Sequence, residues 1–570
     1  MDYKSLYQSW INSSYFNDET KEELLKIKDD EKEIQERFYK DLEFGTGGLR
    51  GIIGAGTNRI NIYTVRKVTC GMANYLIKNK GEKGKKQGVV IAYDSRFKSR
   101  EFCLEAAKTL AAYDIKSYIF NELKSTPELS FAVRELGCAM GIVITASHNP
   151  KDYNGYKVYG EDGGQVCLDE ANAIINEVKS ITDFSTMKIM DEKEAIDKKL
   201  INVLDISFDQ KFIDNVKKQI IRQDIITNYG KNLSIIFTPL HGTGNKPVRE
   251  VLKQVGFENV KVVEQQELPD SSFSTVKYPN PEEREAFDLA VEKAQRENSD
   301  LIIGTDPDCD RVGIVVKNQD EEYVALNGNQ VGALLVRYII EGLKEKNKLP
   351  KNSITIKTIV TSELGKDIAN HYGVDCIDTL TGFKFIGEKI TEFEEDKTEG
   401  KNNFLMGYEE SYGYLVGRHV RDKDAVVATL LIAEMAAYYA SKNMTIYDAL
   451  LDMYEKFGYY QEGLKSITLQ GIEGVNKIKE IMNYFKTSTI ENIANTKVEE
   501  LLDYSKGIDN LPKADVFKFI LEDGSWIAVR PSGTEPKIKF YFGVKSTSQE
   551  KAQKKLELLK ESILHIVDNI

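Results

Sequence analysis

Three carboxylates alternate within one short segment, at Asp306, Asp308 and Asp310. Carboxylates this close repel one another and raise one another's pKa unless a cation lies between them, and Mg²⁺ is a hard cation that prefers such oxygen ligands. An EF-hand loop is excluded, because it would need glycine at Arg311 and glutamate at Lys317. The apolar run before the segment favours a buried cation site over a solvated acidic turn.

A serine and a histidine stand side by side at Ser147 and His148, within the segment TASHNP of residues 145–150. The apolar run of residues 140–144 precedes them, so the segment is expected to leave the carboxyl end of a buried strand. Pro150 keeps a helix from continuing through the loop. A serine presented there could take part in catalysis, although an ordinary polar turn uses the same residue types.

Further loops offer partners for phosphates and hydroxyl groups. Residues 530–534 (RPSGT) place a guanidinium, two hydroxyls and backbone donors together, which suits a phosphate dianion. The glycines of residues 45–51 (GTGGLRG) let backbone amides approach an anion beside Arg50. Glu409 and Ser411 could bind vicinal sugar hydroxyls. Residues 530–534 could instead form an ordinary hairpin turn, and Arg50 could be a solvated arginine. Glu409 and Ser411 could belong to a strand end whose hydrogen bonds are already satisfied.

The elements around these loops alternate between strand and helix patterns in three successive units. Each unit ends a strand in one of the polar loops, at residues 145–150, 304–311 and 407–413, and such loops gather at the carboxyl ends of strands in open α/β sheets. A surface helix over residues 18–40 is expected before the first unit. After about residue 455 the pattern predicts helices and an antiparallel meander.

The composition of the chain indicates which kinds of partner and which cellular compartment to expect. The 77 basic and 89 acidic residues give a formal net charge of −12, which argues against nucleic acid or an acidic membrane surface as a partner. The apolar residues 425–440 are too short for a membrane span and predict a buried helix. No secretory signal opens the sequence, and six scattered cysteines without a CxxC pair indicate reduced thiols in the cytoplasm.

The segments TASHNP, DPDCDR, EES and RPSGTEP occur in this order along the chain, and together they resemble the α-D-phosphohexomutase superfamily. The chain length and GTGGLRG are similar to its bacterial phosphoglucomutase branch, which is itself similar to phosphopentomutase-type enzymes. The resemblance covers residues 42–544. Two residues depart from the superfamily's pattern. Tyr408 stands where many members have glycine, and Ala425 stands where some members have glycine.

The resemblance implies an α/β fold with a four-domain phosphohexomutase architecture around a central cleft. Three tandem βαβ-rich mixed-sheet domains would precede a smaller C-terminal α+β domain. Residues 1–205 would hold the N-terminal helix and the phosphoserine loop, 206–322 the metal-binding loop, 323–455 the sugar-binding loop and 456–570 the phosphate-binding loop.

The resemblance also assigns roles to residues. Ser147 would be the phosphoserine, and its phosphate would complete a Mg²⁺ site formed by Asp306, Asp308 and Asp310. Residues around the transferring phosphoryl group would be Arg50, His148, Lys157, Arg311 and Lys423. The sugar hydroxyls would meet Glu409 and Ser411, and the non-reacting phosphate would meet Arg530, Ser532, Gly533 and Thr534. The general base would be His148, or Lys157 if cationic surroundings lower its pKa.

The expected reaction is interconversion of glucose 1-phosphate and glucose 6-phosphate, with Mg²⁺ and with glucose 1,6-bisphosphate as activator and intermediate. A phosphomannomutase or phosphopentomutase with the same mechanism is the alternative, followed by a metal-dependent sugar phosphatase and a non-catalytic sugar-phosphate sensor. The expected partners are small sugar phosphates, without nucleic acid or membrane, and the expected state is a monomer or weak homodimer.

Overall fold

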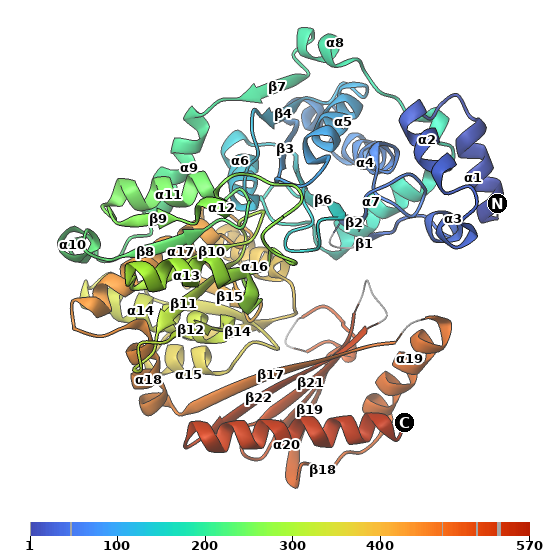
Figure 1. Ribbon diagram of the computed structural model, residues 1–570. Coiled ribbons are helices and arrows are strands. Elements are labelled where there is room, and N and C mark those ends of the chain that lie inside the picture. The colour runs from blue at the N-terminus through green and yellow to red at the C-terminus, as the bar shows by residue number, and fades with distance from the viewer. Residues whose placement is uncertain (1, 46–47, 470, 509–510, 533–536) are drawn as a thin grey trace.

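The computed structural model describes residues 2–45, 48–469, 471–508, 511–532 and 537–570 (Figure 1). Within these ranges the strands form four sheets that follow one another along the chain. The four-domain α/β architecture expected from the sequence is thereby confirmed. Among the described helices, none is long and apolar enough to cross a membrane.

The N-terminal residues form a small helical unit rather than the one helix expected over residues 18–40. The chain forms α1 (Tyr3–Asn12), α2 (Asp18–Lys26) and α3 (Glu31–Phe38). The expected helix is interrupted over residues 27–30, where the Asp30 side chain accepts a hydrogen bond from the Glu33 amide at 3.0 Å and so caps α3. The helices enclose an aromatic cluster around Trp10, which stacks on Phe16 with ring centroids 4.1 Å apart.

The first sheet has the strand order β1-β2-β6-β5-β3-β4-β7. Its central strands run parallel, whereas β6, β2 and β1 are added antiparallel, so the sheet is mixed as expected. The strands are β1 (Phe44–Gly45), β2 (Gly48–Ile52), β3 (Val89–Tyr93), β4 (Ser117–Phe120), β5 (Met140–Ile144), β6 (Tyr153–Tyr159) and β7 (Ile201–Leu204). The helical segments are α4 (Ile62–Gln87), α5 (Ser99–Ala111), α6 (Thr126–Leu136), α7 (Leu168–Ser180), η1 (Phe184–Thr186) and α8 (Glu192–Asp197).

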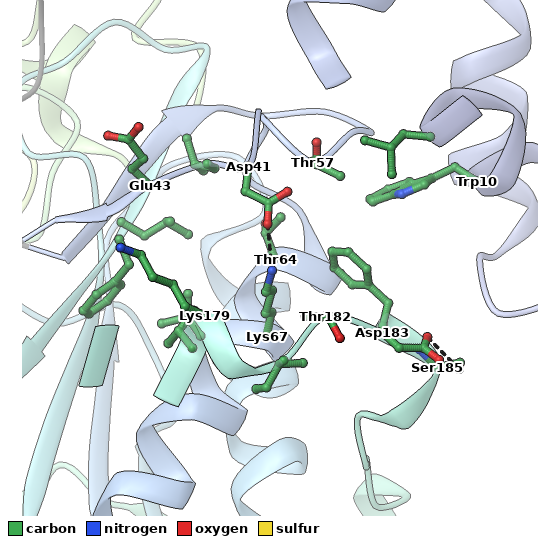
Figure 2. A pocket seen from close by; sticks show the side chains of 18 of the residues that line it. Trp10, Asp41, Glu43, Thr57, Thr64, Lys67, Lys179, Thr182, Asp183 and Ser185 are labelled. Carbon is green, nitrogen blue, oxygen red and sulfur yellow. Dashed lines mark hydrogen bonds and ion pairs between the residues drawn. The ribbon is translucent and has the colours of Figure 1, made fainter. Parts of the chain in front are cut away.

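A cavity of about 950 Å³ lies between the N-terminal helices and the first sheet (Figure 2). Trp10 lines one side, and Asp41 and Lys67 point toward each other across the lining, with a carboxylate oxygen 2.8 Å from Lys67 Nζ. Leu49 of β2 also lines it, one residue before Arg50. Its described lining residues all precede residue 186, so the cavity is separate from the loops of the second and third sheets.

The second sheet has the order β12-β11-β10-β8-β9 and the third the order β14-β13-β15-β16. The expected boundary after residue 322 is contradicted by β12 (Tyr323–Leu326), which pairs with β11 and extends the second sheet. Around the second sheet lie α9 (Ser207–Lys217), α10 (Gln223–Ile225), η2 (Ile226–Gly230), β8 (Ile235–Thr238), α11 (Asn245–Val255), β9 (Val260–Val262), α12 (Glu264–Glu267), η3 (Arg284–Phe287), α13 (Asp288–Glu297), β10 (Leu301–Thr305) and β11 (Val312–Lys317).

The third sheet is covered by helices that share a core with the first two sheets. Its elements are α14 (Gly328–Glu345), β13 (Ser353–Thr358), α15 (Leu364–His371), β14 (Asp375–Thr379), α16 (Phe383–Glu395), β15 (Asn403–Glu409), β16 (Gly413–Val416), α17 (Ala425–Ala440) and α18 (Ile446–Phe457). The expected buried helix over residues 425–440 is confirmed as α17. One contiguous core across three domains fixes the loops of these sheets relative to one another.

The C-terminal domain is built on an antiparallel sheet of order β17-β22-β21-β20-β19-β18, which lies below the other domains in Figure 1. The expected meander corresponds to β20, β21 and β22, and the sheet also includes β17 and β19. An apolar cluster joins this sheet to the third domain. The elements are β17 (Tyr459–Thr468), α19 (Gly471–Thr487), β18 (Asn492–Ile493), β19 (Thr496–Asp503), η4 (Tyr504–Lys506), β20 (Phe517–Leu521), β21 (Trp526–Pro531), β22 (Lys537–Ser546) and α20 (Gln549–Asp568).

Candidate active site

Loops from the first and second sheets meet at Ser147 and Asp306. The serine follows β5 and the aspartate follows β10, each at the carboxyl end of its strand. Ser147 Oγ donates a hydrogen bond to Asp306 Oδ2 at 2.7 Å and lies 3.1 Å from His148 Nδ1. Residues 159 positions apart therefore form one site, as ligand-binding loops of open α/β sheets do.

The three aspartates converge as their spacing suggests. Ligand atoms from Asp306, Asp308 and Asp310 all lie within 4.8 Å of one another, and each side chain is at most 2% exposed. Burial and the charges of Asp308 and Asp310 raise the pKa of Asp306 well above its usual value. Three buried carboxylates at this separation require positive charge among them.

Two observations fit a hard divalent cation at this place. Asp308 Oδ1 and Asp310 Oδ1 are buried and have no hydrogen-bond partner in the described structure. Buried polar atoms are normally satisfied, so these oxygens are left for a ligand that is not a protein group. An all-carboxylate set matches the oxygen preference of Mg²⁺ and Ca²⁺ rather than that of softer metals.

The loop that carries Asp306, Asp308 and Asp310 is held by the domains on both sides. Thr126 at the start of α6 donates from its hydroxyl to Asp308 Oδ2 and from its amide to the Asp308 carbonyl, both at 2.9 Å. On the other side, Arg311 forms a β-bridge with Gly413 of β16. The second domain thus places its carboxylates between the phosphoserine loop candidate and the hairpin of the third domain.

Two lysine side chains form ion pairs with the aspartates. Lys157 Nζ lies 2.9 Å from Asp308 Oδ2, and Lys423 Nζ lies 3.2 Å from Asp310 Oδ2. Burial alone would lower the pKa of Lys157, but Asp308 and Asp310 outweigh burial and raise it. The aspartates thus shift the pKa of Lys157 in the direction opposite to the one that a role as base would need.

The pKa of His148 is lowered, whereas that of Lys157 is raised. Burial, followed by the charges of Arg311 and Arg50, lowers its pKa well below the usual value of histidine. The imidazole is therefore neutral at physiological pH and can accept a proton. Arg50 itself is an exposed residue of β2, which pairs with β6 opposite Gly155. Arg311 ion-pairs with Glu282.

Glu409 and Ser411 belong to the hairpin between β15 and β16. Glu409 is 8% exposed and accepts a hydrogen bond from the Gly382 amide at 2.9 Å. Burial raises the pKa of Glu409 to about 7, with a further increase from Glu410 and an opposing effect of Lys423. Ser411 is partly exposed in the turn.

The pKa of Glu409 predicts a pH-dependent affinity. Above about pH 7 its carboxylate accepts hydrogen bonds from hydroxyl groups, whereas below this pH protonation removes acceptor capacity. The KM for a sugar phosphate should therefore rise as pH falls from 8 to 6. Glu409→Gln should raise KM about tenfold at pH 8. In this variant the remaining pH dependence should be that of the substrate phosphate alone, and an unchanged profile would refute the assignment.

The phosphate-binding candidates of the C-terminal domain are partly described. Arg530 is the penultimate residue of β21, and the Ser532 amide donates to the Lys537 carbonyl at 2.8 Å. Gly533 and Thr534 lie outside the described residues. Burial raises the pKa of Tyr541 on β22, Glu410 adds to this increase and Arg530 opposes it.

Several residues of the site were missed by sequence reasoning. Asp94 and Arg96 follow β3, and Thr126 begins α6. The signal for Asp94 and Arg96 was present, because they are polar residues directly after the apolar run 89–93, as in the other loops. Thr126 gave no such signal, since only the packing of α6 against the aspartate loop brings it to Asp308.

Comparisons with known proteins assign all four domains to one family. Residues 41–184, 210–319 and 327–457 match the phosphoglucomutase/phosphomannomutase alpha/beta/alpha domains I, II and III. Residues 486–560 match the C-terminal domain of the same family. The matched ranges follow the order of the four sheets along the chain.

Related proteins span nearly the whole chain. A phosphoglucomutase of Staphylococcus haemolyticus is 38% identical over 523 residues, which cover 90% of this chain and 91% of that protein. The phosphoglucomutase of Staphylococcus aureus strain MSSA476 is 38% identical over 540 residues, with 92% and 94% covered.

Solved structures share the fold at lower sequence identity. A putative phosphomannomutase of Thermus thermophilus aligns with a TM-score of 0.69 at 21% identity, covering 93% of this chain and 99% of that one. The phosphoglucomutase parafusin of Paramecium aligns with a TM-score of 0.70 at 20% identity, covering 93% and 95%. With its four matched domains and these full-length relatives, the chain belongs to the phosphoglucomutase/phosphomannomutase family of the α-D-phosphohexomutase superfamily.

Proposed function

We propose that this enzyme interconverts α-D-glucose 1-phosphate and glucose 6-phosphate through a phosphorylated Ser147 and a glucose 1,6-bisphosphate intermediate. The observation that carries the proposal is the 2.7 Å contact between Ser147 Oγ and Asp306 within the buried aspartate cluster. Relatives named phosphoglucomutase at 38% identity support glucose as the sugar. The expected substrates are small sugar phosphates that bind at the loops around this contact.

The cation in this proposal is Mg²⁺. Asp306, Asp308 and Asp310 would hold it together with a phosphate oxygen on Ser147, and it would supply positive charge beside the transferring phosphoryl group. Arg50, Lys157, Arg311 and Lys423 add fixed positive charge around the same position. Phosphoryl transfer depends mainly on positioning and charge neutralisation, which suits a site of this composition.

The transfer requires a proton acceptor, and His148 is our candidate. The phosphoryl group moves from Ser147 Oγ to a sugar hydroxyl, so the Ser–O–P bond breaks while a sugar–O–P bond forms. The hydroxyl proton passes to the neutral imidazole, which lies 3.1 Å from Ser147 Oγ and can return a proton to that oxygen. The bisphosphate then turns end for end and returns its other phosphate to Ser147.

The remaining residues would hold the sugar during these steps. Glu409 and Ser411 would bind its hydroxyls, and the loop with Arg530, Ser532, Gly533 and Thr534 would hold the phosphate that does not react. One phosphate site must accept either end of the bisphosphate, and a guanidinium with hydroxyls and backbone amides can do so. The C-terminal domain would therefore serve both halves of the cycle.

A panel of substrates tests the choice of sugar. Initial rates with Mg²⁺ and a trace of glucose 1,6-bisphosphate should be highest for glucose 1-phosphate, compared with mannose, N-acetylglucosamine and ribose 1-phosphates. A profile dominated by ribose or mannose would instead assign phosphopentomutase or phosphomannomutase activity. Release of free phosphate without isomerised sugar phosphate would assign a phosphatase and overturn the proposal.

A further inference from the structure

Ser147 has a backbone conformation that is unfavourable for a residue with a side chain. Its φ angle is +53°, in the left-handed region that glycine tolerates and serine rarely adopts. The residue is nevertheless 3% exposed and lies at the end of a fully buried strand. Such a conformation persists only where surrounding contacts fix it, and strained residues of this kind concentrate at functional sites.

The contacts that fix Ser147 come from one segment after β3. The Ser147 amide donates to Thr145 Oγ1 at 2.8 Å, and the Thr145 hydroxyl donates to Asp94 Oδ2 at 2.6 Å. On the other side, the Arg96 guanidinium donates to the Ser147 carbonyl at 2.5 Å. Arg96 thus holds the carbonyl of the serine directly, whereas Asp94 holds its amide through the Thr145 hydroxyl.

Arg96 also holds the rest of the loop. Its Nη2 donates to the Asn149 carbonyl at 2.5 Å, and its Nη1 donates to the Pro150 and Tyr153 carbonyls at 2.8 and 3.1 Å. Only a planar, multiply donating group can reach four carbonyls at once, so lysine could not replace it. With 3% exposure, Arg96 is a buried charge whose ion-pair partner among the described residues is Asp94.

The second domain packs on Arg96. The ring of Phe273 lies with its centroid 5.0 Å from the guanidinium carbon and is 2% exposed. The loop that carries Phe273 is fixed by His241, whose ring nitrogens lie 3.1 Å from the Leu268 carbonyl and 2.8 Å from Thr275 Oγ1. The phosphoserine loop candidate is therefore tied to the domain that supplies the aspartates.

We propose that Arg96, packed under Phe273, is a positioning residue that holds Ser147 in its left-handed conformation and so aims its side chain at Asp306. The proposal rests on the proposed role of Ser147 as phosphate carrier. Arg96 does not contact the reacting atoms, and it acts through the backbone of residues 147–153. Loss of its contacts should slow phosphoryl transfer while leaving sugar binding nearly unchanged.

The test compares Arg96→Lys with Arg66→Lys as a matched control. Arg96→Lys keeps the positive charge but loses the planar guanidinium that donates to four carbonyls. Arg66 is also a buried arginine of the first domain, and it pairs with Glu105 at 2.6 Å away from the Ser147 loop. Arg96→Lys should lower kcat by about 50-fold or more, with KM within threefold. Hydrogen exchange of the peptide 145–153 should become faster in Arg96→Lys and not in Arg66→Lys, whereas both should lose some thermal stability.

The outcomes separate this proposal from the proposed function. If the wild-type enzyme fails to convert glucose 1-phosphate, the function is wrong, and the exchange measurement still decides whether Arg96 orders the loop. Unchanged exchange in Arg96→Lys, or equal losses of kcat in the two lysine variants, would overturn the positioning role. Phe273→Leu should give a smaller increase in exchange of the same peptide, and no increase would remove the second domain from the proposal.

Discussion

Replacing Ser147 with alanine is expected to lower mutase activity by roughly 10³-fold or more, because the variant has no oxygen to carry the phosphate. The side chain is small and makes two hydrogen bonds at most, so the fold should persist with a similar thermal melting temperature. Conversion of glucose 1-phosphate, measured by coupled reduction of a nicotinamide cofactor, and a melting curve check both statements.

The matched control is Ser180→Ala, in an exposed position at the end of α7 in the same domain. This variant should turn over at the wild-type rate. Intact-mass measurement should find one phosphate on the wild type after incubation with glucose 1,6-bisphosphate, and none on Ser147→Ala. Near-normal turnover of Ser147→Ala would refute the role of the serine.

Removal of the divalent cation is the second change with a large expected effect. A chelator should abolish activity, and Mg²⁺ should restore it. Asp308→Asn should reduce kcat on the order of 10²-fold or more even at high Mg²⁺, because one charged ligand is lost from the cluster of three.

The control for this charge change is Asp320→Asn, in an exposed turn of the same domain. It should keep both the activity and the affinity for Mg²⁺, which calorimetric titration measures. The wild type should bind one divalent cation per chain, and Asp308→Asn should bind it much more weakly. Full activity in the presence of excess chelator would contradict the metal site.

The convergence of the site could be predicted from sequence because it depends on strand direction. Ser147, Asp306 and Glu409 each stand at or just after the carboxyl end of an apolar strand pattern, one in each of the first three sheets, and ligand-binding loops of open α/β sheets gather at such ends. The alternating aspartates lie within one short segment, so their carboxylates are close together whatever the surrounding fold. These features are local in sequence, and so the structure reproduces them.

The charge state of the site could not be predicted in the same way. Lys157 was a candidate base because other cations were expected around it, but its nearest charges are Asp308 and Asp310 of another domain. The pKa of a buried group depends on such tertiary neighbours, which spacing along the chain does not reveal. The same reason explains why the contact of Thr126 with Asp308 was missed.

The N-terminal helices and the C-terminal sheet show a second limit. The pattern over residues 18–40 is amphipathic throughout, so it does not show the turn over residues 27–30 or the Asp30 side chain that caps α3. Strand β17 pairs with β22 over its whole length, although about 70 residues separate them along the chain. Long-range pairing of this kind leaves little trace in local periodicity, and so β17 was not expected as a strand.

The most direct test of the account is transfer of a labelled phosphate from Ser147 to sugar. Enzyme that carries ³²P on this serine is mixed with glucose 6-phosphate in a single turnover, and the products are separated. If Ser147 carries the phosphate, the label leaves it and appears in glucose 1,6-bisphosphate and then in glucose 1-phosphate. Label that remains on the protein, or that appears only as inorganic phosphate, would contradict it.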